Sequence, residues 1–227
     1  MQQRPHLALC CLLCLVALGG CVAQPLAPVV PPEVSVELAD VPFVAQSTDQ
    51  CGPAALAMAL SHSGAEVSIE ELSKGVHLPK RKGSLQLELV AATRRYQRLP
   101  YNFVSQPDDL FRFLEHGLPV IVLQNLGAKW LPIWHYAVVI GYDQPRDRLV
   151  MRSGVTKRRL MGRREFVRRW SASEYWGLVV LEPETAPPAA RAVPFLESVS
   201  GHEALGHWEV ARVGYQTAVR RWPENVY

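Results

Sequence analysis

The spacing of apolar and polar residues along this chain is first typical of helices and then of strands. Helix-forming residues and apolar positions at helical spacing predict four helices, at 51–62, from Ser68, at 84–96 and at 106–116. Short apolar runs rich in valine, leucine and isoleucine then predict four strands, at 119–124, 136–142, 148–152 and 176–181. This order predicts an α+β domain, with helices packed on a mainly antiparallel sheet.

Two proline-rich segments mark the ends of this domain. Residues 21–36 contain four prolines and predict an extended tether, and residues 184–194 predict a linker. The domain between them, 37–183, has an ordinary size. Beyond the linker, 195–227 predict a helical hairpin that resembles one tetratricopeptide repeat, with Ala211, Tyr215, Ala218 and Pro223 at matching positions. One such repeat buries little of its own face, so the hairpin packs on the domain, binds a protein partner, or is the remnant of a longer array.

The first 20 residues have the pattern of a signal peptide. One arginine, Arg4, precedes an apolar run at 7–18 that is short for a membrane span, and two glycines precede Cys21. This order resembles the cleavage box of bacterial lipoproteins, which implies cleavage before Cys21 and acylation of its sulfur; the alternative is an ordinary signal peptide with a chance cysteine. Val22 follows the cysteine, which we interpret as sorting to the outer membrane, facing the periplasm. The acyl chains would provide the membrane contact.

Charge and motif content argue against several other functions. The net charge is only +3, and no long basic patch is interleaved with aromatic residues, so we expect no nucleic-acid partner. A local basic cluster spans 157–169, and we interpret it as a solvated face or a contact with anionic lipid. The chain has no Cys-x-x-Cys, His-Glu-x-x-His or Asp-rich calcium motif and no phosphate-binding glycine loop, so we predict neither metal nor cofactor.

Cysteine usage points to one chemically interesting thiol. Three of the five cysteines lie in the leader and Cys21 is the predicted lipid site, which leaves Cys51 without a partner. Cys51 stands at the start of the helix predicted at 51–62, where unpaired N–H groups and the helix dipole favour a thiolate. Gly52 would leave room for a substrate backbone. These features predict that Cys51 is a nucleophile with a lowered pKa.

A nucleophilic thiol needs a base, and the chain has seven histidines. Most of them fall in the leader, at helix ends, in a loop or beyond the second proline-rich segment. His135 alone opens a predicted strand, so a rigid sheet would orient its side chain. We therefore predict that His135 is the general base.

Two motifs carry a resemblance to a known family. Residues 46–58, Gln-Ser-Thr-Asp-Gln-Cys-Gly-Pro-Ala-Ala-Leu-Ala-Met, resemble the nucleophile motif of the bacteriocin-processing, double-glycine-type cysteine peptidases, and residues 134–143 resemble their histidine motif. The resemblance covers about 37–183, and a lipid-anchored branch with C-terminal tetratricopeptide repeats is the most similar. It implies a papain-like fold, with Cys51 as nucleophile, His135 as base, and the Gln46 side chain in the oxyanion hole; Gln50 is the competing candidate.

The third catalytic member departs from that family. The family has an aspartate at the end of the strand after the histidine strand, where this chain has Ser153. Asp143 and Asp147 lie nearby in sequence but look like turn formers. Three interpretations stay open: a Cys–His dyad oriented by Ser153, a substitute acid from elsewhere, or weakened catalysis.

The sequence thus supports three functional hypotheses. The first is a lipid-anchored cysteine peptidase acting on a peptide or protein. The second is a weak or inactive peptidase fold that binds peptides as an adaptor, with its C-terminal helices holding a protein partner. The third is an acyltransferase on the same fold. Trp130, just before the histidine motif, and Trp134, its first residue, would line the substrate cleft or pack in the core or in a lid.

Overall fold

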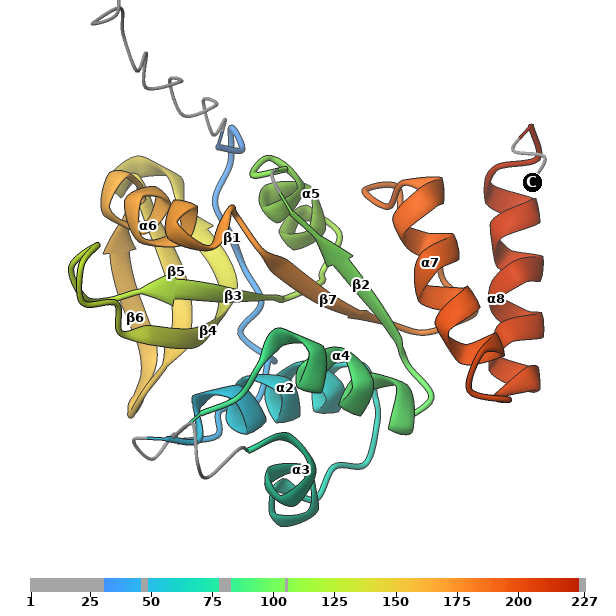
Figure 1. The fold of residues 1–227 in the computed structure, drawn as a ribbon. Helices are drawn as coiled ribbons and strands as arrows, with labels where there is room; N and C mark the ends of the chain where they lie inside the picture. Colours follow the sequence, from blue (N-terminus) through green and yellow to red (C-terminus); the bar gives the residue numbers. More distant parts are fainter. Residues whose placement is uncertain (1–30, 46–48, 78–82, 105, 225–227) are drawn as a thin grey trace, which may run out of the picture.

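The computed structural model describes residues 31–45, 49–77, 83–104 and 106–224 (Figure 1). The predicted signal peptide, the lipidation site Cys21, most of the tether and the oxyanion-hole candidate Gln46 lie outside these ranges. Among the described residues, no helix combines the length and the apolar character needed to cross a bilayer.

One antiparallel sheet forms the centre of the described structure. Its strand order is β2-β7-β3-β4-β5-β6, and a short strand β1 (Val36–Glu37) pairs with β4. The other strands are β2 (Leu99–Phe103), β3 (Val120–Asn125), β4 (Trp134–Asp143), β5 (Arg148–Ser153), β6 (Thr156–Gly162) and β7 (Gly177–Leu181). Every pair is antiparallel, as the segregated order of helices and strands predicts.

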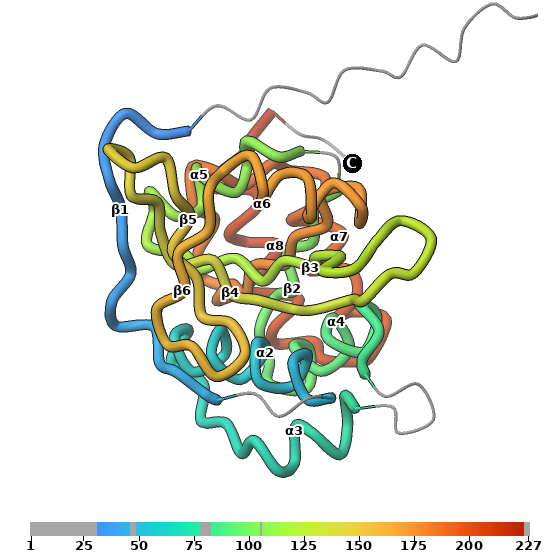
Figure 2. The backbone as a smooth tube through the Cα atoms, turned by 90° about the vertical axis from the view of Figure 1, so that its left-hand side faces the viewer, coloured from blue at the N-terminus to red at the C-terminus, as the bar shows by residue number. Residues whose placement is uncertain are grey.

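Helices cover both faces of the sheet (Figures 1 and 2). One core contains Ile121 and Leu123 of β3 together with α2 (Cys51–His62), α3 (Ile69–Val76) and α4 (Gln86–Arg95). The second core contains their strand neighbours Val120 and Val122 together with α5 (Asp109–Glu115) and α6 (Arg163–Trp170). This alternation is the two-residue period of a strand that is buried on both faces.

The four predicted helices and four predicted strands are confirmed, with ends shifted by up to three residues. Helix α2 spans the predicted range, and Ser68 caps α3 by accepting a hydrogen bond from the Glu71 N–H at 3.4 Å. Gly64 and Gly117 follow α2 and α5 with φ of 76° and 77°, a conformation that glycine adopts without steric cost.

The sequence analysis missed β1, β2, β6 and α6. Strand β2 contains Pro100, which an edge strand tolerates, and β6 carries three successive basic residues on the opposite edge of the sheet. Helix α6 has five basic or acidic residues among its eight, and buries only Phe166 and Trp170. The predicted basic cluster therefore lies on β6 and α6, where Arg158 pairs with Glu37 and Arg163 with Asp147.

The C-terminal hairpin is present and packs on the domain. Helices α7 (Ala192–Glu203) and α8 (Trp208–Arg221) contact each other, and α7 lies against β2. The Ser198 hydroxyl donates to the Pro100 carbonyl at 2.8 Å, and His202 Nε2 donates to the Arg98 carbonyl at 3.0 Å. Because α7 begins at Ala192, the last residues of the predicted linker are helical.

Candidate active site

Cys51 is the first residue of α2, and its side chain is buried between that helix and β4. The backbone N–H of Tyr136 in β4 lies against the thiol, and together with the N–H groups of Gly52 and Cys51 it lowers the pKa of the thiol. Burial acts more strongly and raises the pKa of Cys51 above its usual value. The expected lowered pKa is therefore wrong: the helix start stabilises a thiolate here, but the loss of water outweighs it.

His135 is the second residue of β4, directly before Tyr136. Its Nε2 lies 2.9 Å from the Ser153 hydroxyl oxygen at the end of β5, which leaves Nδ1 as the ring nitrogen for any partner on the other side. Burial, helped by the nearby positive charge of Arg159, lowers the pKa of His135 to about 4. At neutral pH the imidazole is therefore uncharged.

The fold brings the start of α2 and the start of β4 together. The thiol of Cys51 touches the residue that follows His135, although the two motifs are far apart in sequence. With a raised thiol pKa and a lowered imidazole pKa, both groups are neutral in the resting protein. Gln50 is the exposed residue preceding α2, and its side chain makes no capping hydrogen bond.

Neither nearby aspartate replaces the missing acid. Asp143 and Asp147 lie at the far end of β4, where Asp143 accepts from Arg146, and Asp147 accepts from Tyr142 and Arg163. Asp147 has φ of 49°, as the interpretation of a turn former predicts. Among the described residues, the Ser153 hydroxyl is the side-chain group that hydrogen-bonds His135.

The sequence analysis missed Ser84. A β-carbon at Gly52 would lie 2.5 Å from the Ser84 hydroxyl oxygen, so Ser84 fills the space that we had expected Gly52 to leave for substrate. The Ser84 hydroxyl is buried without a hydrogen-bond partner in the described structure. No motif or spacing marks this serine, because its position depends on how the segment before α4 packs against α2.

A cavity of about 320 Å³ lies beside these residues. It is lined by Ser84, Leu85, Gln86, Leu123, Trp134, Tyr136 and Ser173. Trp134 is 48% exposed and Trp130 is 84% exposed, so neither packs in the core; Trp134 lines the cavity, and packing of either residue in a lid stays a prediction. The cavity is large enough for one or two side chains of a bound peptide.

The described residues hold no cluster of three or more histidine, cysteine, aspartate or glutamate side chains that could bind a metal ion.

A comparison with protein families matches residues 38–177 to the family model described as "Peptidase_C39 like family". The chain belongs to this family. The matched segment contains Cys51, His135 and Ser153 and ends at the first residue of β7. A comparison with curated proteins gave no significant match.

Several solved structures are similar to this chain. A C39-like peptidase from Bacillus anthracis has 18% identity and a TM-score of 0.55, over 66% of this chain and 98% of its own. A double-glycine-motif protease from an AMS/PCAT transporter, solved with the leader peptide, has 22% identity and a TM-score of 0.49, over 63% and 91%. The peptidase domain of Streptococcus ComA, an ABC transporter of quorum sensing, has 24% identity and a TM-score of 0.48, over 62% and 98%. The Bacillus anthracis structure, with its TM-score of 0.55, and the family match confirm the papain-like, α+β fold.

Replacing Ser153 with aspartate is expected to raise the pKa of His135 and to move the acidic limb of the kcat/KM profile to higher pH. A carboxylate beside Nε2 stabilises the imidazolium, whereas a hydroxyl carries no charge. The measurement is the pH dependence of kcat/KM for a cleaved peptide. Ser153→Asn is the neutral control; equal acidic limbs in the two variants would contradict the assignment of Ser153 as the partner of His135.

Acidification is expected to destabilise the fold between pH 6.5 and about 4 through His135. Because its pKa is 6.5 when exposed and about 4 when folded, the unfolded chain binds more protons in this window, so the contribution of His135 is complete above pH 6.5 and is lost as pH falls. The loss amounts to roughly 2–3 kcal/mol. Urea unfolding of wild type and His135→Gln across this range measures it: the difference between the two curves should change with pH, and parallel curves would contradict the lowered pKa.

Proposed function

We propose that this chain is a cysteine peptidase that hydrolyses a peptide or protein, with Cys51 as nucleophile and His135 as general base. The observation that carries the proposal is the Cys51 thiol at the start of α2, held against the Tyr136 N–H directly after His135. Membership of the C39-like family supports the same reaction class.

The neutral resting pair implies a particular order of proton transfers. His135 Nδ1 takes the thiol proton as the sulfur attacks the substrate carbonyl carbon, so the thiolate forms only on the reaction path. The Cys51 N–H and the Gln46 side chain would stabilise the oxyanion, and Ser153 would hold the imidazole in its orientation. The imidazolium then protonates the leaving amine, and water, deprotonated by His135, hydrolyses the thioester to a free acid and restores the thiol.

The test is labelling with a thiol-directed peptidyl inhibitor, followed by mass mapping of the label and sequencing of the products of peptide digestion. We expect one label on Cys51 and products with new free carboxyl ends. Products joined to an added amine would instead identify an acyltransferase. Absence of both label and cleavage in the folded protein would overturn the proposal.

A second candidate is a peptide-binding adaptor with little or no catalysis. Two points favour it: His135 is hydrogen-bonded by the uncharged Ser153, where the sequence resemblance implies an acid, and the pKa of His135 is lowered to about 4, which makes the imidazole a weak base. In this case the Cys51→Ala variant and the wild type would bind peptides equally and turn over none. The C-terminal helices would then hold the protein partner.

The membrane anchor is also part of the proposal. Acylation of Cys21 would tether the domain to the periplasmic face of the outer membrane through residues 21–36. Metabolic labelling with a radioactive fatty acid tests it: we expect label in the wild type and none in Cys21→Ser. Equal labelling, or a wild-type protein in the soluble periplasmic fraction, would contradict it.

A further inference from the structure

We infer that the cavity between the β3–β4 loop and the end of α6 binds a carboxylate of the substrate, which makes the preferred substrate an acidic peptide; this inference rests on the proposed peptidase function. The loop, residues 126–133, projects from the body of the domain (Figure 2). The cavity beneath it holds about 630 Å³, within the range of ordinary ligand sites.

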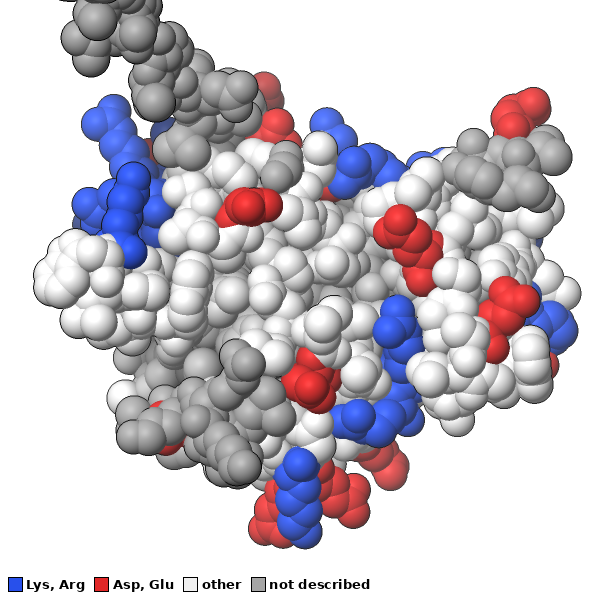
Figure 3. Space-filling model, viewed as in Figure 1, with Lys and Arg blue, Asp and Glu red and all other residues white. Residues whose placement is uncertain are grey.

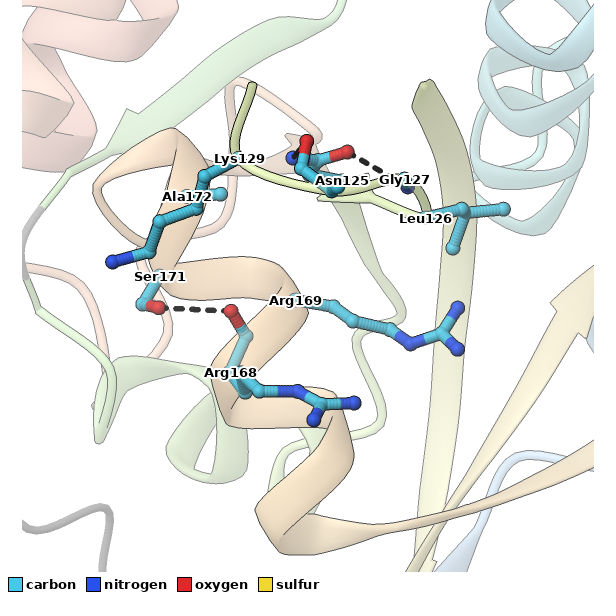
Figure 4. Close-up of a pocket in the computed structure, with 9 residues that line it drawn as sticks. Asn125, Leu126, Gly127, Lys129, Arg168, Arg169, Ser171 and Ala172 are labelled. Carbon is cyan, nitrogen blue, oxygen red and sulfur yellow. Dashed lines mark hydrogen bonds between the residues drawn. The ribbon is translucent and has the colours of Figure 1, made fainter. Parts of the chain in front are cut away.

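The charge of this cavity favours an anion. Three basic side chains line it, Lys129 from the loop and Arg168 and Arg169 from α6, and no acidic side chain is among its described lining residues (Figure 4). Arg169 pairs with Glu165 at 2.7 Å. Neither Lys129 nor Arg168 makes an ion pair with a described residue, and their side chains point to different sides of the cavity, so each offers a separate positive charge to a ligand (Figure 4). Lysine and arginine side chains gather over α6, next to uncharged surface (Figure 3).

The walls of the cavity are held in place by hydrogen bonds. The side-chain oxygen of Asn125 (Oδ1) accepts hydrogen bonds from the backbone N–H groups of Gly127 and Ile133, each at 2.9 Å. These two bonds hold the ends of the loop together. Next to the lining residues Ser171 and Ala172, the Ser173 hydroxyl donates to the Leu123 carbonyl at 2.7 Å and fixes the turn after α6 to β3. A site that is already ordered loses less entropy when a ligand binds.

The basic cavity and the 320 Å³ cavity are lined by neighbouring residues of β3 and of the turn after α6. Strand β7 pairs with β3 only at Ile121 and Val122, so the end of β3 is covered by the short helix η3 (Ser171–Ser173) instead of a strand. Leu123 and Ser173 line the 320 Å³ cavity beside the thiol, whereas Asn125 and Ser171 line the basic one. Leu123 and Asn125 are two strand residues apart, roughly 7 Å, which an extended peptide covers in about two residues. One peptide can therefore occupy both cavities.

The competing explanation is structural. Lys129, Arg168 and Arg169 lie near the C-terminal end of α6, where basic side chains stabilise the negative end of the helix dipole. In that case their removal would lower the melting temperature of the protein and would leave its choice of peptide unchanged.

The experiment measures selectivity for carboxylates with the full-length protein and a random decapeptide library, synthesised both with a free C-terminus and as the C-terminal amide. In the wild type we expect one of two results. Either Asp and Glu are enriched at one fixed position relative to the cleaved bond in both libraries, or peptides are cleaved at a fixed distance from the C-terminus in the free-acid library alone. The first result identifies a side-chain carboxylate and the second a terminal one. A wild type that cleaves without either preference would overturn the inference and leave the peptidase function standing.

The matched variants are Lys129→Glu/Arg168→Glu and, as a control, Lys74→Glu, which reverses an exposed lysine on α3. The test uses two peptides that differ only as Glu or Gln at the enriched position, or as acid or amide at the C-terminus. The selectivity is the kcat/KM of the acidic peptide divided by that of the neutral one. The double variant should lower this ratio at least tenfold. The control should keep the wild-type ratio. An unchanged ratio in the double variant would overturn the inference; if that variant fails to fold, Lys129→Gln, on the exposed loop, replaces it.

If the wild type cleaves no peptide, the peptidase function fails and the carboxylate site is tested by binding alone. Fluorescence anisotropy of Cys51→Ala with labelled Glu-rich and Gln-rich decapeptides should then show tighter binding of the acidic peptide. Adding the double charge reversal should abolish this preference. Equal binding of the two peptides would overturn the inference.

Discussion

Replacing Cys51 with alanine is expected to lower kcat by about 10³-fold or more, because no other described cysteine can form the acyl-enzyme. The loss should appear in kcat, since the peptide still finds both cavities. Single-turnover and steady-state kinetics with one cleaved peptide provide the measurement, and the same variant should lose the inhibitor label. Its folded stability should fall by only about 1 kcal/mol, because the substitution removes a single sulfur atom from a site at the rim of the core.

His135 offers the companion test. His135→Ala is expected to lower kcat by about 10²–10⁴-fold, the usual contribution of a general base, while leaving the thiol in place. His116→Gln is the matched control, because His116 lies after α5 and bonds to the Arg112 carbonyl, away from the site. A variant lacking His135 that retains wild-type kcat would show that the thiol uses another base, and full activity in Cys51→Ala would end the case for this nucleophile.

Replacing Trp170 with alanine is expected to lower the free energy of unfolding by about 4–5 kcal/mol, the largest effect on stability that we predict. Truncating a buried tryptophan costs about 3–5 kcal/mol through lost burial and the cavity left behind. Trp170 is fully buried against Phe103, Phe166 and Tyr175, and its indole N–H donates to the Trp176 carbonyl at 2.7 Å. The lost hydrogen bond adds about 1 kcal/mol.

Urea unfolding measures this loss, with Trp130→Ala as the control. Trp130 is 84% exposed at the tip of the β3–β4 loop, so its truncation should change the free energy of unfolding by less than about 0.5 kcal/mol. The loss in the free energy of unfolding for Trp170→Phe should lie between those of Trp170→Ala and Trp130→Ala. Similar losses for Trp170→Ala and Trp130→Ala would contradict the packing of α6 against the sheet.

The helices and strands that the sequence predicted are those whose signals are local. Helix α2 begins at the predicted residue because Pro53 suits the first turn and small helix-forming residues follow, and α3 begins after a serine that caps it. Strands β2 and β6 were missed because edge strands tolerate proline and exposed basic residues, which erase the apolar pattern. Helix α6 was missed because two buried side chains in eight residues give a weak period.

The structure places the predicted site residues close together, their catalytic roles stay predictions, and the expected ionised thiol is wrong. Sequence reasoning selected Cys51, His135 and Ser153, and the structure gathers them where α2 meets β4 and β5. It expected an ionised thiol from the helix start alone. The pKa values of both groups depend on how much water the surrounding segments exclude, and those segments are distant in sequence.

By itself, the sequence determined the family motifs, the α+β order of elements and the serine at position 153 where the resemblance implies an aspartate. Each of these depends on a few neighbouring residues only. Only the tertiary structure decided which charge state the thiol and imidazole adopt, that Ser84 occupies the space beside Gly52, and that a basic cavity forms between the β3–β4 loop and the end of α6. These depend on burial and on contacts between β3, η3 and the loop, and burial is a property of the assembled core. A local pattern can place a residue at the start of a helix, but it cannot determine which distant segments will cover it.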